Sequence, residues 1–240
     1  MDDLEVIIDA ASREMISRTC IPYREIPTAV VYPRSAESVA QVVVAANEFD
    51  VPVWPVSTGR NFGYGERSAC YPGGITMILD KMTRLMVNEK LGYAMIDPGV
   101  TYKQLDDTLK QQGSAYWADA AGTTQYASVL GNALDKGRGL TPYADHFGSI
   151  CGMDIVLPDG SVLQTGGGPR DNNNVRHTYR HGVGPSLEGL FAQSNLGIVV
   201  SAGIWLMPAP ERFDWAAFEY TKSRADLPAF VRDLQQLVAK

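Results

Sequence analysis

The hydrophobic residues of this chain fall into short runs whose spacing alternates between that of strands and that of helices. Compact apolar or β-branched runs predict strands at residues 28–32, 51–56, 75–80, 93–97 and 197–207. In the second of these runs, Pro52 and Pro55 lack the N–H groups that full ladder pairing requires. These runs predict a fold that contains a β-sheet.

Other segments have the spacing and the end signals of helices. Ser35 is expected to cap a helix that runs to Phe49. The buried face of that helix is expected to consist of Val39, Val42, Val43 and Ala46. Thr101 is expected to cap a second helix, which Gly113 ends. A third helix is expected over residues 185–195, because Pro185 suits a helix start.

The last segment of the chain has a strongly one-sided helical pattern. Ser223 can cap a helix that runs to Lys240. Its apolar face is expected to comprise Leu227, Phe230, Val231, Leu234, Leu237 and Val238. Such a face must pack on something: this domain, a missing domain or another chain.

A hairpin is the clearest local motif of the second half. The stretch MDIVL, the turn Pro158-Asp-Gly and the stretch SVLQT predict antiparallel strands over residues 153–165. Residues 166–180, with three consecutive asparagines, are expected to form a mobile surface loop. Strands that alternate with helices and interleave with hairpins indicate an α+β fold with a mixed sheet.

Size and charge narrow the class of protein. The chain has 240 residues and is 45% apolar, which is typical of a globular protein with one large or two small domains. With 21 Lys+Arg against 27 Asp+Glu the net charge is −6 and no basic stripe stands out, so nucleic acid is not an expected partner. No apolar run approaches the roughly 18 residues of a membrane span.

The N-terminus and the cysteines bear on the compartment. The first ten residues, MDDLEVIIDA, are acidic, which is the wrong charge for a signal peptide. The three cysteines, Cys20, Cys70 and Cys151, are far apart and match no zinc or redox spacing. A reducing compartment and a cytoplasmic location are therefore expected.

Two loops rich in small residues are the strongest candidates for a binding site. Residues 57–65 hold three glycines in seven residues, so the backbone there can take positive φ and approach another group closely. Residues 119–128 form a second such loop, which leads into VLGNALDKG at residues 129–137. Consecutive amides in such turns can hold an anion. The alternative is that both loops are structural turns.

The chain lacks the common nucleotide and nucleophile motifs. It contains no GxxxxGK[ST], no G-x-G-x-x-G after a first strand and no G-x-S-x-G. His177 and His181 have no third ligand nearby, so a metal site is not expected. His146, beside Asp145, is either an orienting group or a structural histidine. By spacing alone, the chain is an α+β protein that can bind a phosphorylated ligand.

At these loops the sequence resembles the vanillyl-alcohol oxidase and 4-cresol dehydrogenase family. The stretch PVSTGRNFGYG at residues 55–65 resembles the first FAD loop of that family. Further blocks fit in the same order at residues 97–102, 128–137, 140–146, 182–191, 195–198 and 203–208. The resemblance covers roughly residues 25–235, nearly the whole chain.

The resemblance implies an FAD site made largely of backbone. The first loop would wrap the FAD pyrophosphate through Val56, Ser57, Thr58, Gly59, Arg60 and Asn61. A second wall would come from Ser128, Gly131 and Asn132, at a helix start whose positive end faces phosphate. The remaining cofactor contacts would come from Gly137, Gly139, Gly197 and Ile198. In this family the flavin carries out the redox chemistry and the protein positions it.

The resemblance singles out Tyr64 for substrate. In phenol-oxidising members the tyrosine of this Gly-Tyr-Gly helps to hold the substrate phenolate, which pushes electrons toward its para carbon so that a hydride leaves to flavin N5. A hydroxyl donor that stabilises the anion meets that need. The alternative is that Tyr64 only packs beside the flavin.

Three departures from the family pattern qualify what the resemblance implies. The family is about twice as long, and its second half, a cap domain with most of the substrate pocket and any covalent flavin anchor, has no counterpart here. Gly122 stands where oxidases of the family carry an acidic base. The first loop has Gly63-Tyr64 rather than the histidine that berberine-bridge-type relatives use for covalent attachment. FAD is therefore expected to bind noncovalently.

The resemblance implies a domain order and a fold. Residues 1–25 are expected to form a helical lead-in, residues 26–210 an FAD-binding domain of two α+β subdomains, and residues 211–240 the start of a cap domain or a linker helix. This is the fold of p-cresol methylhydroxylase-type FAD-binding domains without the C-terminal cap.

The resemblance also implies an activity and partners. The expected function is FAD-dependent oxidation of para-substituted phenols, with a small phenolic substrate, a cap domain or second chain, and a cytochrome as candidate electron acceptor. One alternative is a noncatalytic FAD-binding module or half-enzyme. The other is a flavin oxidoreductase for a different substrate, such as a hydroxy acid.

Overall fold

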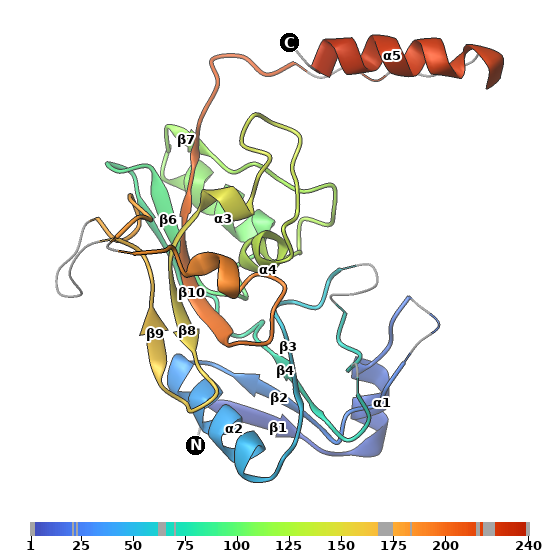
Figure 1. Cartoon of the computed structure of the whole chain (residues 1–240), viewed down its shortest axis with the longest axis vertical. Helices are drawn as coiled ribbons and strands as arrows, with labels where there is room; N and C mark the ends of the chain where they lie inside the picture. Colours follow the sequence, from blue (N-terminus) through green and yellow to red (C-terminus); the bar gives the residue numbers. More distant parts are fainter. Residues whose placement is uncertain are drawn as a thin grey trace. The chain divides into compact units, whose positions relative to one another are not determined.

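The computed structural model of the chain describes residues 3–20, 22, 24–61, 66–69, 71–167, 175–182, 184–214, 217 and 224–238. By its internal contacts the chain divides into two units, residues 1–209 and residues 210–240. The described part of the first unit forms a four-stranded sheet, a five-stranded sheet and a short two-stranded one (Figure 1). It is an α+β structure, as the sequence predicts.

The four-stranded sheet is mostly parallel. Across the sheet its strands are β1 (Leu4–Ile7), β2 (Ala29–Pro33), β4 (Ile75–Ile78) and β3 (Val53–Val56). The strands β2, β4 and β3 run parallel, and β1 pairs antiparallel with β2. Because β3 lies at the edge and pairs only with β4 among the described strands, Pro55 within it is tolerated, and Pro52 precedes the strand.

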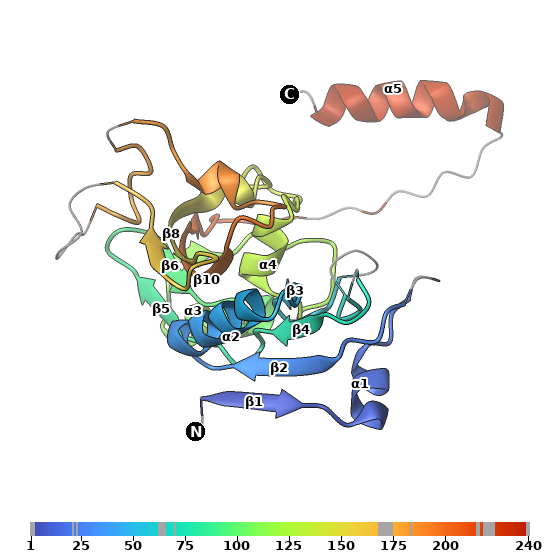
Figure 2. The same ribbon diagram turned by 60° about the horizontal axis from the view of Figure 1, so that its bottom comes forward.

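The helix α2 (Ala36–Glu48) packs between the two main sheets. The Oγ of Ser35 accepts a hydrogen bond from the Ser38 amide at 3.1 Å, which caps the helix start. Its buried residues include all four that the sequence predicts for its buried face. Three of them, Val39, Val42 and Val43, belong to one apolar cluster with residues of both sheets: Val31, Met77, Val156 and Val200. Figure 2 shows α2 between β2 and β4 on one side and β8 and β10 on the other.

The five-stranded sheet is antiparallel throughout. In spatial order its strands are β5 (Leu85–Asn88), β6 (Tyr93–Ile96), β10 (Ile198–Trp205), β8 (Ile150–Val156) and β9 (Val162–Gln164). Residues of β10 alternate between two cores, since Val200 faces α2 while Val199, Ala202 and Ile204 join the other cluster. The predicted hairpin is β8–β9, and β8 begins three residues earlier than expected.

Two helices cover the other face of this sheet. They are α3 (Tyr102–Gln111), capped by Thr101, and α4 (Val129–Leu134), capped by Ser128. Leu105 and Leu109 of α3 and Leu130 of α4 pack in the main core. The two-stranded sheet pairs β7 (Tyr116–Trp117) with β11 (Met207–Pro208). A 3-10 turn, η1 (Phe147–Ser149), precedes β8.

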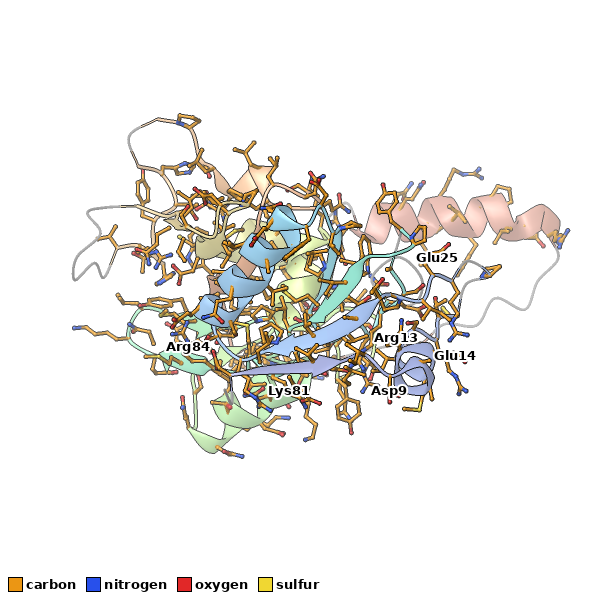
Figure 3. All side chains as sticks on the ribbon, turned by 90° about the horizontal axis from the view of Figure 1, so that it is seen from below. Asp9, Arg13, Glu14, Glu25, Lys81 and Arg84 are labelled. Carbon is orange, nitrogen blue, oxygen red and sulfur yellow. The ribbon has the colours of Figure 1, made fainter. Side chains whose placement is uncertain are left out.

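The first residues contribute a strand as well as a helix. Over residues 1–25, where only a helical lead-in is predicted, the structure has β1 followed by α1 (Ala10–Ile16). The carboxylate of Asp9 caps α1 by accepting from the Ser12 amide at 2.9 Å, and Arg13 Nη1 donates to the Pro27 carbonyl at 2.7 Å. Figure 3 shows Asp9, Arg13 and Glu14 gathered around this helix.

Two further predictions differ from the structure. The helix predicted over residues 185–195 is only a 3-10 turn, η2 (Glu188–Leu190), because Gly189 weakens helix formation, although Glu188, Phe191 and Ala192 are buried. The surface loop predicted over residues 166–180 falls partly outside the described residues. Its described part is anchored, since His177 is buried and its Nδ1 lies 2.9 Å from the Cys151 carbonyl.

The second unit contains η3 (Arg224–Asp226) and α5 (Leu227–Val238). The predicted ends of this helix, Ser223 and Lys240, lie outside the described residues. Leu227, Val231 and Leu234, on its predicted apolar face, are exposed. Across the described residues, no helix combines the length and the apolar character needed to cross a bilayer.

Candidate functional site

The loop that follows β3 turns sharply at Gly59. Gly59 has φ +62°, a conformation that strains residues with a side chain. A Cβ at this position would also collide with the side chain of Arg67. Thr58 is buried and Arg60 is exposed. The loop therefore needs a glycine at position 59 for its backbone path.

Ser128 organises the start of α4. Its Oγ accepts from the Gly131 amide at 2.8 Å and donates to the Pro98 carbonyl at 2.6 Å. The amide of Val129 donates to the Val100 carbonyl at 3.0 Å. Two first-turn N–H groups are thus already satisfied within the protein, which limits what this helix start can offer to an anion.

The two loops, which are far apart in the sequence, meet in the structure. Ser57 Oγ occupies the place that a Cβ on Gly131 would take. Close by in the sequence, Asn61 Nδ2 lies 3.3 Å from Asp135 Oδ2, a hydrogen bond that spans 74 residues. Burial raises the pKa of Asp135, and the hydrogen bond from Asn61 partly offsets that effect. The residues of the first loop and of α4 therefore form one surface.

A buried polar network supports the α4 side of this surface. His146 Nε2 lies 2.8 Å from Asp119 Oδ2, and His146 Nδ1 lies 2.5 Å from Asn132 Oδ1. Tyr102 donates its hydroxyl to Asn132 Oδ1 at 3.1 Å. The side chains of His146 and Asp119 are only 8% and 5% exposed, so these polar groups satisfy one another inside the protein.

Burial fixes the role of Tyr102 in this network. Loss of solvent raises the pKa of its hydroxyl, and the nearby Asp119 carboxylate raises it further. The hydroxyl therefore stays protonated and acts as a donor. Beside the network lies a small cavity lined by Tyr102, Asp119, Tyr143, His146, Ser149 and Trp205, among others.

Sequence reasoning missed this network. It considered Asp145 as the neighbour of His146, whereas the partner is Asp119, 27 residues earlier. The aspartate was visible only as the first residue of a small-residue loop. No local spacing joins the network's members, so only the fold brings them together.

Gly137 and Gly139 lie against the same network. A Cβ on Gly137 would meet the side chain of Asn132. A Cβ on Gly139 would meet the carboxylate of Asp119 and Nε2 of His146. Both candidate cofactor residues therefore lie beside the network of Asp119, Asn132 and His146. Because neither has a side chain, they leave room for these three side chains to contact one another.

Gly197 and Ile198 stand at the start of β10. Ile198 pairs with Val156, and Gly197 packs against Ile155 and Phe191. In the described part of the chain, their link to the two loops is indirect. Four residues before Gly197, the backbone amide of Gln193 donates to the Leu134 carbonyl at 3.1 Å at the end of α4.

The candidate substrate residue, Tyr64, lies outside the described residues, as does Gly63. Gly122, which stands where family oxidases carry a base, is exposed and has open space around it. Among the described side chains, the structure therefore assigns no acidic base at that position.

The described residues contain no cluster of three or more His, Cys, Asp or Glu side chains that could hold a metal. Burial lowers the pKa of His177, and its ring lies 5.4 Å from that of Tyr93. Trp205 Nε1 donates to the His177 carbonyl at 2.9 Å. His177 is thus part of the packed interior.

Comparison with known proteins identifies the fold around these loops. Residues 27–166 match the family described as FAD binding domain. The chain is 38% identical over 188 residues to the 4-cresol dehydrogenase [hydroxylating] flavoprotein subunit of Pseudomonas putida, an alignment that covers 78% of this chain and 36% of the relative. It is 40% identical over 210 residues to 1'-carboxy-chondrochloren decarboxylase of Chondromyces crocatus, covering 86% of this chain and 39% of the relative.

A solved structure agrees with this assignment. The 4-ethylphenol oxidase from Gulosibacter chungangensis in complex with isoeugenol superposes with a TM-score of 0.85 and 38% identity. The superposition covers 95% of this chain and 44% of the oxidase. The resemblance found in the sequence is confirmed, and the chain spans less than half the length of these relatives.

Proposed function

We propose, because this chain belongs to the FAD-binding domain family, that it forms the cofactor-binding part of an oxidoreductase that acts on para-substituted phenols. FAD is the cofactor of this chain, and its family is one of FAD-linked oxidoreductases. The substrate, the electron acceptor and the remaining parts of the enzyme belong to the proposal.

One observation supports the FAD site: Ser57 of the first loop lies directly against Gly131 of α4, so the two segments form one continuous surface. A pyrophosphate is held best by backbone N–H groups that it can approach closely, which small residues permit. Gly59 would supply that access in the first loop, and Gly131 lets this loop approach α4 closely. The residues present therefore fit FAD, with its pyrophosphate along residues 56–61.

The chain's own residues keep this surface in shape. Asn132 is held by His146 and Tyr102, so the wall at α4 has one side-chain arrangement. Asn61 ties the first loop to Asp135. Bound FAD supplies the hydride acceptor for the reaction. Preorganised walls of this kind reduce the entropy lost when a cofactor binds.

Tyr64 is the residue that we assign to the substrate. Its hydroxyl would donate to a phenolate oxygen, which stabilises the anion from which a hydride leaves most readily. The names of two relatives, a 4-cresol dehydrogenase and a 4-ethylphenol oxidase, support a phenol with a para substituent. A cap domain or second chain would complete the substrate pocket.

The electron acceptor and the cellular location are the remaining parts of the proposal. A cytochrome and oxygen are the two alternatives for the electron acceptor that reoxidises the flavin. A cytoplasmic location is supported by Cys20 and Cys151, which are free thiols. The half-enzyme alternative, in which a separate chain supplies the cap, is decided by the reduction experiment that follows.

Anaerobic reduction of the FAD-loaded chain tests the substrate. We expect 4-ethylphenol to bleach the visible flavin band, while D-lactate leaves it unchanged. Bleaching by D-lactate alone would contradict the phenol proposal in favour of a hydroxy acid. No bleaching by either compound, with FAD bound, would favour the half-enzyme that needs a cap chain.

A variant of Tyr64 tests the assigned role. Tyr64→Phe removes only the hydroxyl, so we expect FAD to stay bound while binding of 4-ethylphenol weakens by about tenfold, as for one hydrogen bond to a charged group. Perturbation of the flavin spectrum during phenol titration measures that affinity. Loss of FAD in this variant would make Tyr64 a structural residue instead.

A further inference from the structure

Arg67 lies against the loop that carries Gly59 and bonds to its backbone. Its Nε and Nη2 lie 3.3 and 3.0 Å from the Thr58 carbonyl oxygen. The same Nη2 lies 3.2 Å from Asp80 Oδ2, and both side chains of this ion pair are about three-quarters buried. Neither residue belongs to the loop motif itself.

The backbone of Arg67 is fixed from two neighbouring strands. Thr76 of β4 donates its hydroxyl to the Arg67 carbonyl at 3.3 Å. Trp54 of β3 donates its indole N–H to the carbonyl of Glu66, the preceding residue, at 3.2 Å. Trp54 and Thr76 are direct partners in the parallel register. The backbone at Arg67, in the loop between β3 and β4, is therefore anchored to both strands.

Asp80 binds the same guanidinium nitrogen that contacts the Thr58 carbonyl. Burial raises the pKa of its carboxyl, and the charges of Arg67, Lys81 and Arg60 lower it. Within the described residues, Oδ1 of Asp80 is buried without a hydrogen-bond partner, so the carboxylate is bound through Oδ2. A carboxylate in this position depends on Arg67 for its compensation.

The Thr58 carbonyl determines where the next amide points. In a trans peptide the C=O of one residue and the N–H of the next lie on opposite sides of the peptide plane. The described residues contain no cis peptide, so this holds for the bond between Thr58 and Gly59. With the carbonyl turned toward Arg67, the Gly59 N–H is directed away from it.

From this geometry we propose that Arg67 is a positioning residue for the cofactor loop. By holding the Thr58 carbonyl, it directs the Gly59 N–H toward the bound pyrophosphate and keeps Gly59 in its positive-φ conformation. A loop without this support would have to order its amides at the moment of binding, at a cost in affinity. This inference rests on the assignment of the FAD pyrophosphate to residues 56–61.

Three variants separate positioning from general folding. Arg67→Ala removes both bonds to Thr58, whereas Arg67→Lys retains a cation that can reach one acceptor. Asp80→Asn keeps the shape of the carboxyl but removes its charge. The matched control is Arg84→Ala, which breaks the 3.1 Å ion pair with Asp97 in the other sheet. Figure 3 labels Arg84.

The measurements are the FAD dissociation constant, from quenching of flavin fluorescence, and the ³¹P NMR spectrum of bound FAD. We expect Arg67→Ala to weaken FAD by at least about tenfold, the size expected for a hydrogen bond to a charged group. The pyrophosphate resonances should move toward those of free FAD, while the flavin absorption spectrum keeps its bound shape. Arg67→Lys should recover part of the affinity, and Asp80→Asn should lose part of it.

The outcomes separate this inference from the proposed site. If the wild-type chain fails to bind FAD, the site assignment is wrong. If it binds FAD and Arg67→Ala leaves both affinity and ³¹P shifts unchanged, the positioning role is wrong. Equal losses in Arg84→Ala would reduce Arg67 to a general stabilising residue. Should Arg67→Ala not fold, the lysine and asparagine variants decide by the same two measurements.

Discussion

Ser57 Oγ fills the space next to Gly131 that any larger residue at position 131 would need for its Cβ. Ser57 follows β3, and Gly131 lies in α4, which packs on the other sheet. This contact brings the first loop and α4 together, the two segments that the family resemblance implies as walls of one FAD site. The proposed FAD site depends on it.

Gly131→Ala tests the contact directly. Alanine favours a helix by about 1 kcal/mol over glycine, so the substitution on its own should stabilise α4. Because the methyl group would displace Ser57, we expect weaker FAD binding, with the apoprotein folded. The double variant with Ser57→Gly should recover part of that loss. Strict additivity in this double-mutant cycle, measured by flavin fluorescence, would show that the two positions do not interact.

Gly59→Val should abolish FAD binding. The branched side chain would force a strained φ, costing on the order of 1–2 kcal/mol, and would collide with Arg67. Gly73→Ala is the matched control, since Gly73 has φ +78° and a Cβ added there would have nothing within 4 Å. Retention of FAD after gel filtration distinguishes them. Unchanged affinity in Gly59→Val would contradict the assignment of this loop.

His146→Ala should destabilise the fold. The substitution removes one hydrogen-bond partner each from Asp119 and Asn132, which keep the Thr141 amide and the Tyr102 hydroxyl, so we expect a loss of about 1–3 kcal/mol. Urea unfolding measures this change. His181→Ala, at an exposed histidine, should change stability by less than about 0.5 kcal/mol. Equal stability of the two variants would mean that the network contributes nothing to the free energy of unfolding.

Asp135 should make folding stability depend on pH. Because burial raises its folded pKa above the usual 3.8, the folded state binds a proton more readily than the unfolded state. Its contribution to stability is therefore greatest below pH 3.8 and is lost as the pH rises through the raised value. Relative to wild type, Asp135→Asn should gain stability over that range. A difference between the two proteins that does not change with pH would contradict this.

Local sequence signals are sufficient to predict most of the helix starts and strands of the fold. Ser35, Thr101 and Ser128 are N-caps in the structure because their side-chain oxygens accept from amides three residues later. The prolines around β3 agree with its edge position. These features depend on interactions over a few residues, which spacing can reveal.

The missed features depend on contacts over long distances or on exposed positions. β1 has a mostly exposed burial pattern, so its residues show no strong apolar alternation. The pairing of His146 with Asp119, and of Arg67 with Thr58 and Asp80, requires the folded backbone. Proline at 185 is equally compatible with a turn, and Gly189 made the predicted helix unfavourable.

The central claim is that the loop at residues 56–61 and α4 together hold FAD. Its most direct test is the visible spectrum of the purified 240-residue chain after incubation with FAD and gel filtration. We predict a flavin band that stays with the protein peak at close to one FAD per chain and disappears in Gly59→Val. A colourless peak from protein that circular dichroism shows to be folded would contradict the claim.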